Sequence, residues 1–418
     1  MRRLISVVAV TVVAAAATLT TLTPALSDDA QTKVVSANPV DSTPHALDGT
    51  VYAFTEVGTR VFVGGSFTKI KNAGSSTTIN QKNLFAFDRS TGKIDTTFRP
   101  TLNSAVYALA PGPSGSVFAG GLFSTVNGAT NRGLVRLSSA GNRSGTFGIS
   151  SGYVRDLITR GNQLYVGGAF STVNGVARSR LARLDATTGA VDSKLKFTFS
   201  DPINGGALKV YDMALSPDGT KLVATGSFTK VNGSTRMQVA MFNTSGTLSS
   251  WATSRYGAVC NNVAYDSYIR DVDFDPTGKY FVIVTTGGPF GNTTLCDSAA
   301  RWDAAKTGSG QQPQWANWTG GDTLLSVSCT GVAVYVGGHQ RWLDNPLGHD
   351  TAGPGAVSRP GIGAINPTTG KALSWNPTRT RGHGVETLDA YAGGLLVGSD
   401  TEELGHEYHA RLGMFPPG

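Results

Sequence analysis

Short apolar runs separated by glycine-rich turns recur along the whole chain. Three of them lead into a glycine pair and continue alike: VFVGGSFTKIKN (residues 61–72), VFAGGLFSTVNG (residues 117–128) and LYVGGAFSTVNG (residues 164–175). Alternating apolar and polar positions indicate half-buried β-strands, and the polar turns that contain glycine are typical of hairpins. The pattern therefore predicts an all-β protein of many short strands.

The glycine-pair strand recurs at positions 64, 120, 167, 225, 286, 337 and 397, with a mean spacing of about 55 residues. Each unit reads as four short strands joined by turns. Self-similarity at a fixed period is the mark of a repeat architecture, and repeated four-stranded antiparallel units are typical of β-propellers. We therefore predict a seven-bladed β-propeller with four-stranded antiparallel blades, forming one domain over residues 28–418.

The last unit ends at ARLGMFPPG after only three predicted strands. Near the N-terminus, SANPVDSTPHALDGTVYAF is similar in register to SWNPTRTRGHGVETLDAY, which precedes the last unit. Residues 34–39 are therefore predicted to supply the missing outer strand of the last blade. Such a strand closes the ring and removes its two free edges.

The N-terminus carries Arg2 and Arg3, then an apolar run rich in small residues, then Ala25-Leu26-Ser27. This order is typical of a secretory signal peptide, so residues 1–27 are predicted to be removed on export. The alternative is a membrane anchor, but no other apolar run is long enough to span a bilayer. We expect a secreted, extracellular protein without membrane insertion.

The net charge limits the classes of partner that we expect. The formal charge is +7, and it falls to +5 when the two arginines of residues 1–27 are removed. Lysine and arginine are scattered rather than clustered, which argues against a nucleic-acid partner. We expect a monomer that binds a glycan or an extracellular protein.

These motifs resemble a known group. The GGxF(S/T)xVNG units, together with VGGHQRW, SWNPTRTRG and VGSDTE, are similar to the secreted bacterial β-propellers of the delta-60-repeat type. The resemblance extends from about residue 35 to residue 418. It implies the propeller fold and export but no activity, because the family is largely a domain of unknown function.

The propeller topology also sorts the three cysteines. In a blade, the loop between the second and third strands lies on the same face as the crossing into that blade. Cys260 lies in the crossing into the fifth unit and Cys296 in the second loop of that unit, so we predict a Cys260–Cys296 disulfide. Cys329 falls at a hairpin on the opposite face and is predicted to stay a thiol. Their spacing does not suggest a metal site.

The repeat breaks down at VYVGGHQRWLDNPLGHD, residues 334–350. Three irregular segments, residues 339–360, 379–384 and 399–409, are predicted to share the same face around the sixth and seventh blades. Irregular loops on a rigid scaffold are where binding residues concentrate. The predicted ligand-binding residues are His339, Arg341, Trp342, Asp344, Arg381, His383, Asp400, Glu403 and His406.

Each group in this region has a functional and a structural interpretation. Trp342 stacks on a sugar ring while His339 and Arg341 donate hydrogen bonds, or Trp342 fills the position of the repeated Phe while Arg341 pairs with Asp344 or Asp350. The segment from Asp400 to His409 holds a Ca²⁺ or Zn²⁺ ion, or it forms a salt-bridged loop that clamps Arg379 and Arg381. No cofactor is otherwise expected.

Three aspartates occupy the same place in the innermost strands of the third, fourth and fifth units, namely Asp156, Asp212 and Asp271. They either hold a cation in the central channel or make a repeated hydrogen bond that fixes blade geometry. The strand pattern around Asp271 does not provide the encircling loop that calcium requires.

The sequence favours a binding module over an enzyme. Neither a phosphate-binding loop nor a dinucleotide fingerprint is present. One alternative is a polysaccharide hydrolase or lyase that uses the acidic residues of the same face, since glycosidases need a carboxyl pair. Another is a structural interaction scaffold without a small-molecule ligand.

Overall fold

The computed structural model describes residues 30–258, 260, 265–391 and 393–418. The predicted signal peptide lies outside these residues. Within them the protein is all-β, and its helical elements are the short 3₁₀ turns η1 (Pro113–Gly115), η2 (Ile203–Gly205) and η3 (Arg255–Gly257). No helix of the described chain is long and apolar enough to cross a membrane.

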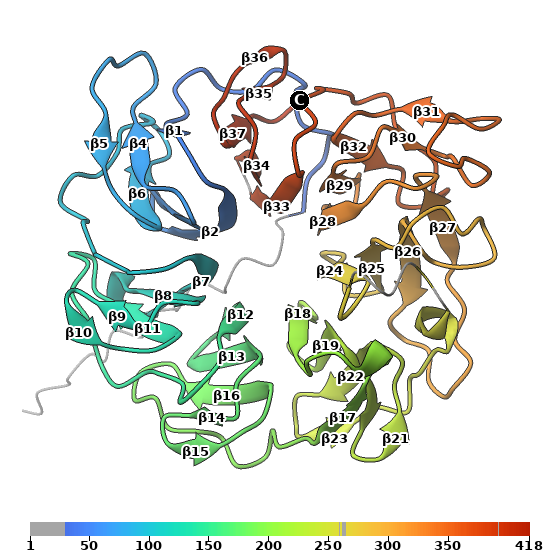
Figure 1. Cartoon of the computed structure of the whole chain (residues 1–418), viewed down its shortest axis with the longest axis horizontal. Helices are drawn as coiled ribbons and strands as arrows, with labels where there is room; N and C mark the ends of the chain where they lie inside the picture. Colours follow the sequence, from blue (N-terminus) through green and yellow to red (C-terminus); the bar gives the residue numbers. More distant parts are fainter. Residues whose placement is uncertain (1–29, 259, 261–264, 392) are drawn as a thin grey trace, which may run out of the picture.

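The main strands form antiparallel sheets of three or four strands, which Figure 1 shows arranged around a common centre. In chain order, the first three contain β2 (Val51–Val57), β3 (Arg60–Gly65) and β6 (Leu84–Asp88); β7 (Val106–Pro111), β8 (Val117–Gly121) and β11 (Leu134–Leu137); and β12 (Val154–Arg160), β13 (Gln163–Gly168) and β16 (Leu181–Asp185). The fourth contains β18 (Val210–Leu215), β19 (Lys221–Gly226), β22 (Val239–Asn243) and β23 (Thr247–Leu248).

The next three sheets continue the same order. They contain β24 (Ile269–Phe274), β25 (Tyr280–Thr285), β26 (Ser298–Asp303) and β27 (Trp315–Trp318); β28 (Leu324–Cys329), β29 (Val334–Gly338) and β32 (Ile362–Ile365); and β33 (Val385–Tyr391), β34 (Gly394–Ser399) and β37 (Leu412–Phe415). The first strand of each sheet faces the centre in Figure 1. We refer to these seven sheets as sheets one to seven.

The segments after the glycine pair form small hairpins rather than the plain polar loops expected from the sequence. In sheet two, Val126 pairs with Ala129 around Asn127 and Gly128, whose φ angles are 51° and 76°. Two consecutive positive φ angles define a type I′ turn, which the Asn-Gly pair favours. The added strands are β1 (His45–Ala46), β4 (Lys69–Lys71), β5 (Ile79–Asn80), β9 (Thr125–Val126), β10 (Ala129–Thr130), β14 (Thr172–Val173), β15 (Val176–Ala177), β17 (Phe199–Pro202), β20 (Phe228–Val231), β21 (Ser234–Thr235), β30 (Trp342–Leu343), β31 (Val357–Ser358), β35 (Glu403–Leu404) and β36 (Glu407–Tyr408).

These hairpins pair with the crossing from the preceding sheet, as in the bridge between Leu102 and Val126 and that between Arg379 and Leu404. The crossing and the second loop of each sheet therefore lie on one face, as the topology predicted. We call it the crossing face.

The predicted fourth strand is present as a strand only in sheets four and five, as β23 and β27. In sheets one, two, three and six it is reduced to a single antiparallel bridge, such as that between Phe87 and Ile94. The prediction of four full strands in every unit is therefore confirmed only for sheets four and five of the described chain. A one-residue outer edge offers little backbone to another chain, which limits edge-to-edge association.

The N-terminal segment lies along the last sheet. The Ser36 amide donates to the Pro416 carbonyl at 2.9 Å, and the Val40 amide donates to the Met414 carbonyl at 2.7 Å. No strand is assigned to the described residues 34–39, so the contact is two backbone hydrogen bonds rather than the full outer strand that was predicted.

The repeated glycines have a packing role between neighbouring sheets. A Cβ on Gly64 would lie 2.7 Å from the Cγ1 atom of Val106, which begins the next innermost strand. In the last sheet, a Cβ on Gly398 would lie 2.7 Å from Cγ1 of Val51 in the first. Only glycine allows this approach, and the apolar core lies in these spaces between sheets.

Candidate functional site

Each innermost strand contains a β-bulge at its second residue. The pairing register shifts between the first and third residues in all seven cases, for example between Val51 and Ala53. A bulge leaves one residue unpaired and redirects its side chain. We call these residues the bulge ring: Tyr52, Tyr107, Arg155, Tyr211, Arg270, Leu325 and Glu386. All of them line a central cavity of about 240 Å³.

Aromatic and guanidinium groups alternate along part of the bulge ring. The rings of Tyr52 and Tyr107 make an edge contact at 5.2 Å between centroids. The Arg155 guanidinium carbon lies 5.0 Å from the Tyr107 centroid and 4.6 Å from that of Tyr211. Arg155 also donates from Nη2 to the Tyr211 hydroxyl at 3.1 Å. These cation–π contacts hold the guanidinium plane in place.

Arg270 continues this arrangement on the other side of Tyr211. Its guanidinium carbon lies 5.4 Å from the Tyr211 centroid and 4.8 Å from that of Tyr265. Burial raises the pKa of Tyr211, but the positive charges of Arg155 and Arg270 outweigh burial, so the pKa lies below its ordinary value. A phenol between two cations is a strong hydrogen-bond donor.

The bulge ring opens on the crossing face into a wider cavity of about 430 Å³. Lys209 lies at this mouth, 2.9 Å from Asp266 and 5.8 Å from the Tyr211 centroid. The lining is rich in tyrosine and cations: Tyr107, Leu122, Tyr153, Arg155, Lys209, Tyr211, Tyr265, Asp266, Ser267 and Arg270. These residues were not predicted from the sequence. The feature that could have marked them is the second residue of VYAF, VYAL, VRDL, VYDM and IRDV, which is Tyr or Arg in each.

On the opposite side of the ring, Glu386 contacts His383. The His383 Nδ1 and Glu386 Oε1 atoms are 2.5 Å apart, and this hydrogen bond raises the pKa of His383. His383 belongs to the predicted site, and it is the member that touches the bulge ring directly.

Two of the three channel aspartates make the repeated hydrogen bond of their structural interpretation, while Asp156 accepts from the Leu157 amide of its own strand at 2.7 Å. Asp212 Oδ2 accepts from the Val272 amide at 2.9 Å, and Asp271 Oδ2 accepts from the Val327 amide at 2.7 Å. Each bond joins one sheet to the next. Burial raises the pKa of Asp156 to about 7, and the Asp271 charge adds to this effect.

Around sheets six and seven, the central residue is one that the sequence analysis missed. Asp322, with a side chain 3% exposed, accepts from Arg341 Nε at 2.8 Å and from Arg381 Nη2 at 2.6 Å. His339 Nε2 lies 3.8 Å from the same carboxylate, and the Arg381 Nε donates to the His339 carbonyl at 2.9 Å. We call these four residues the Asp322 cluster. Its only sequence signal was an aspartate after the tandem glycines of TGGDT.

Trp342 does not fill the position of the repeated Phe, so that interpretation was wrong. Its backbone pairs with Ser358 in the β30–β31 hairpin, and Arg341 lies 4.4 Å over its ring. Counting from the glycine pair, Gln340 occupies the Phe position. Gln340 is fully buried, and neither its amide nitrogen nor its amide oxygen has a hydrogen-bond partner. The equivalent Phe67, Phe123 and Phe170 are 0–1% exposed.

Of the two predicted partners of Arg341, only Asp350 is in reach, at 3.5 Å. Asp344 instead accepts from Asn317 Nδ2 at 2.5 Å and from the Ala372 amide at 3.1 Å. It is therefore tied to the outer part of sheets five and six, away from the Asp322 cluster.

The predicted residues of the last loop serve separate contacts. Asp400 accepts from the His383 and Gly384 amides at 2.7 and 3.0 Å. Glu403 accepts from the Thr380 hydroxyl at 3.2 Å, and His406 contacts Thr378 Oγ1 from the β35–β36 turn. In the described part of the chain, no group of three or more His, Cys, Asp or Glu side chains is arranged to hold a metal ion.

Arg379 is the clamp between sheets six and seven. It is 7% exposed, and its guanidinium donates to the Gly338 carbonyl at 2.6 Å, the Gly361 carbonyl at 3.3 Å and the Thr401 hydroxyl at 3.0 Å. The predicted clamp therefore exists, but it bonds to backbone and hydroxyl groups rather than to the loop carboxylates.

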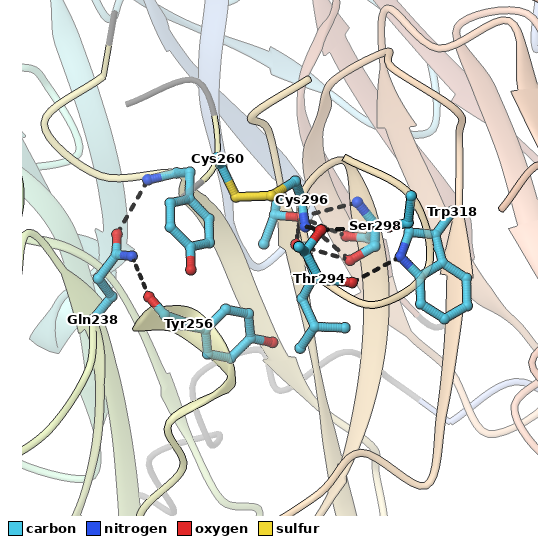
Figure 2. Close-up of a disulfide and its surroundings, with 11 residues drawn as sticks. Gln238, Tyr256, Cys260, Thr294, Cys296, Ser298 and Trp318 are labelled. Atoms are coloured by element: carbon cyan, nitrogen blue, oxygen red, sulfur yellow. Dashed lines mark hydrogen bonds between the residues drawn. A yellow bond between two sulfur atoms is a disulfide. The ribbon is translucent and has the colours of Figure 1, made fainter. Parts of the chain in front are cut away.

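The predicted disulfide is confirmed. Cys260 and Cys296 are bridged, with their Cα atoms 5.6 Å apart. Figure 2 shows the bridge between the crossing segment and the loop that carries Thr294, whose carbonyl accepts from the Trp318 indole at 3.0 Å. Cys329 stays outside the bridge, as predicted, and its buried thiol donates to the Asp273 carbonyl at 3.8 Å.

Comparison with known proteins supports the fold. Residues 112–143, 162–194 and 216–248 match the model of a family described as a domain of unknown function (DUF5122) beta-propeller. Each matched segment spans the glycine-pair strand, its hairpin and the following strand of sheets two, three and four. No curated protein matches the chain.

Proposed function

We propose that this chain, a β-propeller with repeats of the DUF5122 type, is an exported module that binds a glycan at the mouth of its central channel. In this proposal, sheets one to seven are the blades of one ring. The packing of Gly398 against Val51 and the hydrogen bonds from Ser36 and Val40 to the last strand support closure of that ring.

The bulge ring is the observation that carries the binding proposal. Tyrosine faces suit the C–H faces of sugar rings, and their hydroxyls suit sugar hydroxyls. The mouth cavity of about 430 Å³ has the size of ordinary small-ligand sites, about 300–1,000 Å³. A concave, tyrosine-lined mouth fits a short saccharide better than the face of a folded protein. We therefore favour the glycan over the extracellular protein.

The predicted residues of sheets six and seven take a supporting role in this proposal. The charges of Arg341 and Arg381 are matched by Asp322, and Asp400 caps backbone amides. His339 and His383 connect this region to the bulge ring. The proposed binding site is therefore the channel mouth, and it lies inward of the irregular loops that were predicted from the sequence to bind ligand.

The hydrolase alternative needs two carboxyl groups on opposite sides of a bound sugar. Three of the carboxylates on which it relied are engaged elsewhere: Asp344 with Asn317 and a backbone amide, Asp400 with two backbone amides, and Glu403 with the Thr380 hydroxyl. The scaffold alternative predicts no saccharide binding, so the same experiment separates it from our proposal.

The test is a glycan array followed by calorimetry on the chain from residue 28 onward. Tyr211→Ala and Tyr265→Ala should each weaken binding of the selected glycan about five- to tenfold, since each loses an aromatic face worth about 1–1.5 kcal/mol. Tyr408→Ala is the matched control, because Tyr408 is 50% exposed on the outer hairpin of sheet seven. Binding that depends on Trp342 and not on Tyr211 would contradict the proposed site.

Export has its own test. N-terminal sequencing of protein recovered from culture medium should begin near Asp28. Recovery only from cells, with residues 1–27 retained, would contradict it.

A further inference from the structure

We infer that the glycan carries an anionic group, a carboxylate or a sulfate, which Arg155 and Arg270 bind on the two sides of Tyr211. This inference rests on the proposed binding function and names the chemical class of its ligand.

Arg155 and Arg270 form no close ion pair. Both side chains are half-buried, and neither takes part in a salt bridge among the described residues. The Nε atom of Arg270 is buried and has no hydrogen-bond partner. Burial disfavours the Arg155 cation, but the charges of Tyr211 and Glu386 outweigh burial, so the pKa of Arg155 lies above its ordinary value and the group stays charged.

Other buried or half-buried arginines of the protein show the contrast. Arg183 pairs with Asp192 at 2.6 Å, Arg341 pairs with Asp322, and Arg379 donates to carbonyl oxygens of sheet six. Arg155 has the Tyr211 hydroxyl as its hydrogen-bond acceptor, and Arg270 lies mainly against aromatic rings. Arg136, Arg236 and Arg301 also lack a carboxylate partner, but each donates to a backbone carbonyl oxygen. In the described residues, Arg155 and Arg270 have no such carbonyl acceptor.

Acidic groups also face this pair of arginines. Glu386 lies in the same ring but is held by His383, and Asp266 is held by Lys209. Below the ring, Asp212 and Asp271 accept backbone amides of the next sheet. Each of these carboxyl groups has a closer partner of its own. The charge of Glu386 also acts on Arg155, but it forms no salt bridge with it, so the N–H groups of both guanidinium groups stay available to a ligand.

The orientation of the two guanidinium groups also suits an anion. Stacking on tyrosine faces fixes the plane of each guanidinium and leaves its N–H edge for hydrogen bonds. A planar N–H fork suits carboxylate or sulfate oxygens in a bidentate contact. The Tyr211 hydroxyl lies between the two forks as a further donor, and Tyr153 and Tyr265 supply walls for the attached sugar. A uronic-acid or sulfated saccharide combines these features.

The experiment compares three probes by calorimetry on the chain from residue 28 onward. They are a trigalacturonic acid, its fully methyl-esterified form, and a sulfated oligosaccharide. We expect at least one anionic probe to bind at least tenfold more tightly than the uncharged ester. We also expect that affinity to fall when NaCl rises from 50 to 500 mM, because screening weakens charge pairing.

Arg155→Gln and Arg270→Gln should each lower the anionic affinity at least tenfold. Arg143→Gln is the matched control, because it removes the same charge at an exposed position away from both cavities. Arg270→Lys should give an intermediate loss, since it keeps the charge but not the planar fork. Melting temperatures within 2 °C of the wild type would show that the variants fold.

The outcomes separate this inference from the proposed function. Binding to the carboxylate probe or only to the sulfated one supports the inference and identifies the anion. Equal binding of acid and ester, lost in Tyr211→Ala but kept in both Arg→Gln variants, overturns the inference and leaves the proposed function standing.

If no saccharide binds, the proposed function fails, and inorganic sulfate then decides the inference. Sulfate at equal ionic strength with chloride should raise the melting temperature of the wild type. It should not raise that of the Arg155→Gln, Arg270→Gln double variant. An equal rise in both proteins overturns the inference.

Discussion

Two parts of the crossing face behave in opposite ways. The loops of sheets six and seven depart from the repeat, yet their arginines are engaged inside the fold: Arg341 and Arg381 by Asp322, and Arg379 by oxygen atoms of the chain. The bulge ring keeps the repeat, yet Arg155 and Arg270 take part in no salt bridge among the described residues and lie mainly against aromatic rings.

The comparison separates two kinds of sequence signal. A departure from a repeat shows that a unit is built differently, and here much of the difference is used to hold sheets six and seven together. A polar group without a partner inside the fold shows where something else is able to bind. The second signal needs coordinates, and it points to the channel mouth.

The largest expected effect concerns the disulfide. Replacing both Cys260 and Cys296 with Ser should lower the unfolding free energy by about 3–4 kcal/mol, given the 36-residue separation. The bridge anchors the crossing that carries Tyr265, so ligand affinity should fall as well. Urea unfolding and calorimetry measure the two effects. A stability loss with unchanged affinity would show that this crossing does not shape the channel mouth.

Asp322→Ala should destabilise the loops of sheets six and seven without changing the channel mouth. It leaves Arg341 and Arg381 without their shared counter-charge, and we expect a loss of about 2–3 kcal/mol. This is below the usual cost of breaking a buried pair, because both arginines are partly exposed. Urea unfolding measures the loss, and affinity for the glycan should change less than threefold.

Asp350→Asn is the control for this variant. Its side chain is 64% exposed and 3.5 Å from Arg341, so we expect less than about 0.5 kcal/mol. If Asp322→Ala abolished binding without lowering stability, the contrast between the two regions would be reversed.

The seam between the first and last sheets should respond to pH. Burial, then the nearby charges of His409 and Lys71, lower the pKa of His45 to about 4 from 6.5. The unfolded chain therefore takes up a proton that the folded chain refuses, and stability falls as pH drops. The expected loss from this group between pH 7 and pH 5 is about 2 kcal/mol.

His45→Gln should flatten that part of the curve of unfolding free energy against pH. His383→Gln is the control of opposite sign, because Glu386 raises the pKa of the exposed His383 and folding favours its protonated form. An unchanged slope in His45→Gln would mean that the seam is not acid-sensitive through this residue.

The smallest expected effect is that of a substitution which restores an apolar side chain at the Phe position of the repeat in sheet six. Gln340→Met places an apolar side chain of similar shape where sheets one to four have Phe, and it removes an amide without partners. We expect a gain of about 1 kcal/mol in unfolding free energy. Gln238→Met is the matched control, because this buried amide donates to the Tyr256 carbonyl and accepts from Ser267, so it should destabilise by about 1–3 kcal/mol.

The features that follow from strand topology were predicted correctly from the sequence. The repeat spacing placed Cys260 near Cys296, and the shared face of crossings and second loops followed from strand direction. Sequence reasoning failed where local geometry departs from a regular strand. Regular alternation puts Tyr52 and Ala53 on opposite faces, and a bulge was needed to place both in the channel wall.

The missed residues share a physical reason. Asp322 corresponds to Asp48 and Asn103, which accept the amides of Thr68 and Ser124 as Asp322 accepts that of Arg341. Its spacing from the glycine pair differs from theirs, so the repeat did not mark it. Trp342 was the most conspicuous residue of the broken repeat, but the residue that replaces Phe is Gln340. Side-chain partners across sheets depend on distances that spacing along the chain does not contain.

The central claim is that ligand binds at the bulge ring and not at the loops of sheets six and seven. The direct measurement is NMR of protein with labelled tyrosine and tryptophan rings, titrated with the saccharide that binds best. We predict large shifts for Tyr211 and Tyr265 and little change for the Trp342 indole. Shifts at Trp342 with Tyr211 and Tyr265 unmoved would contradict the account.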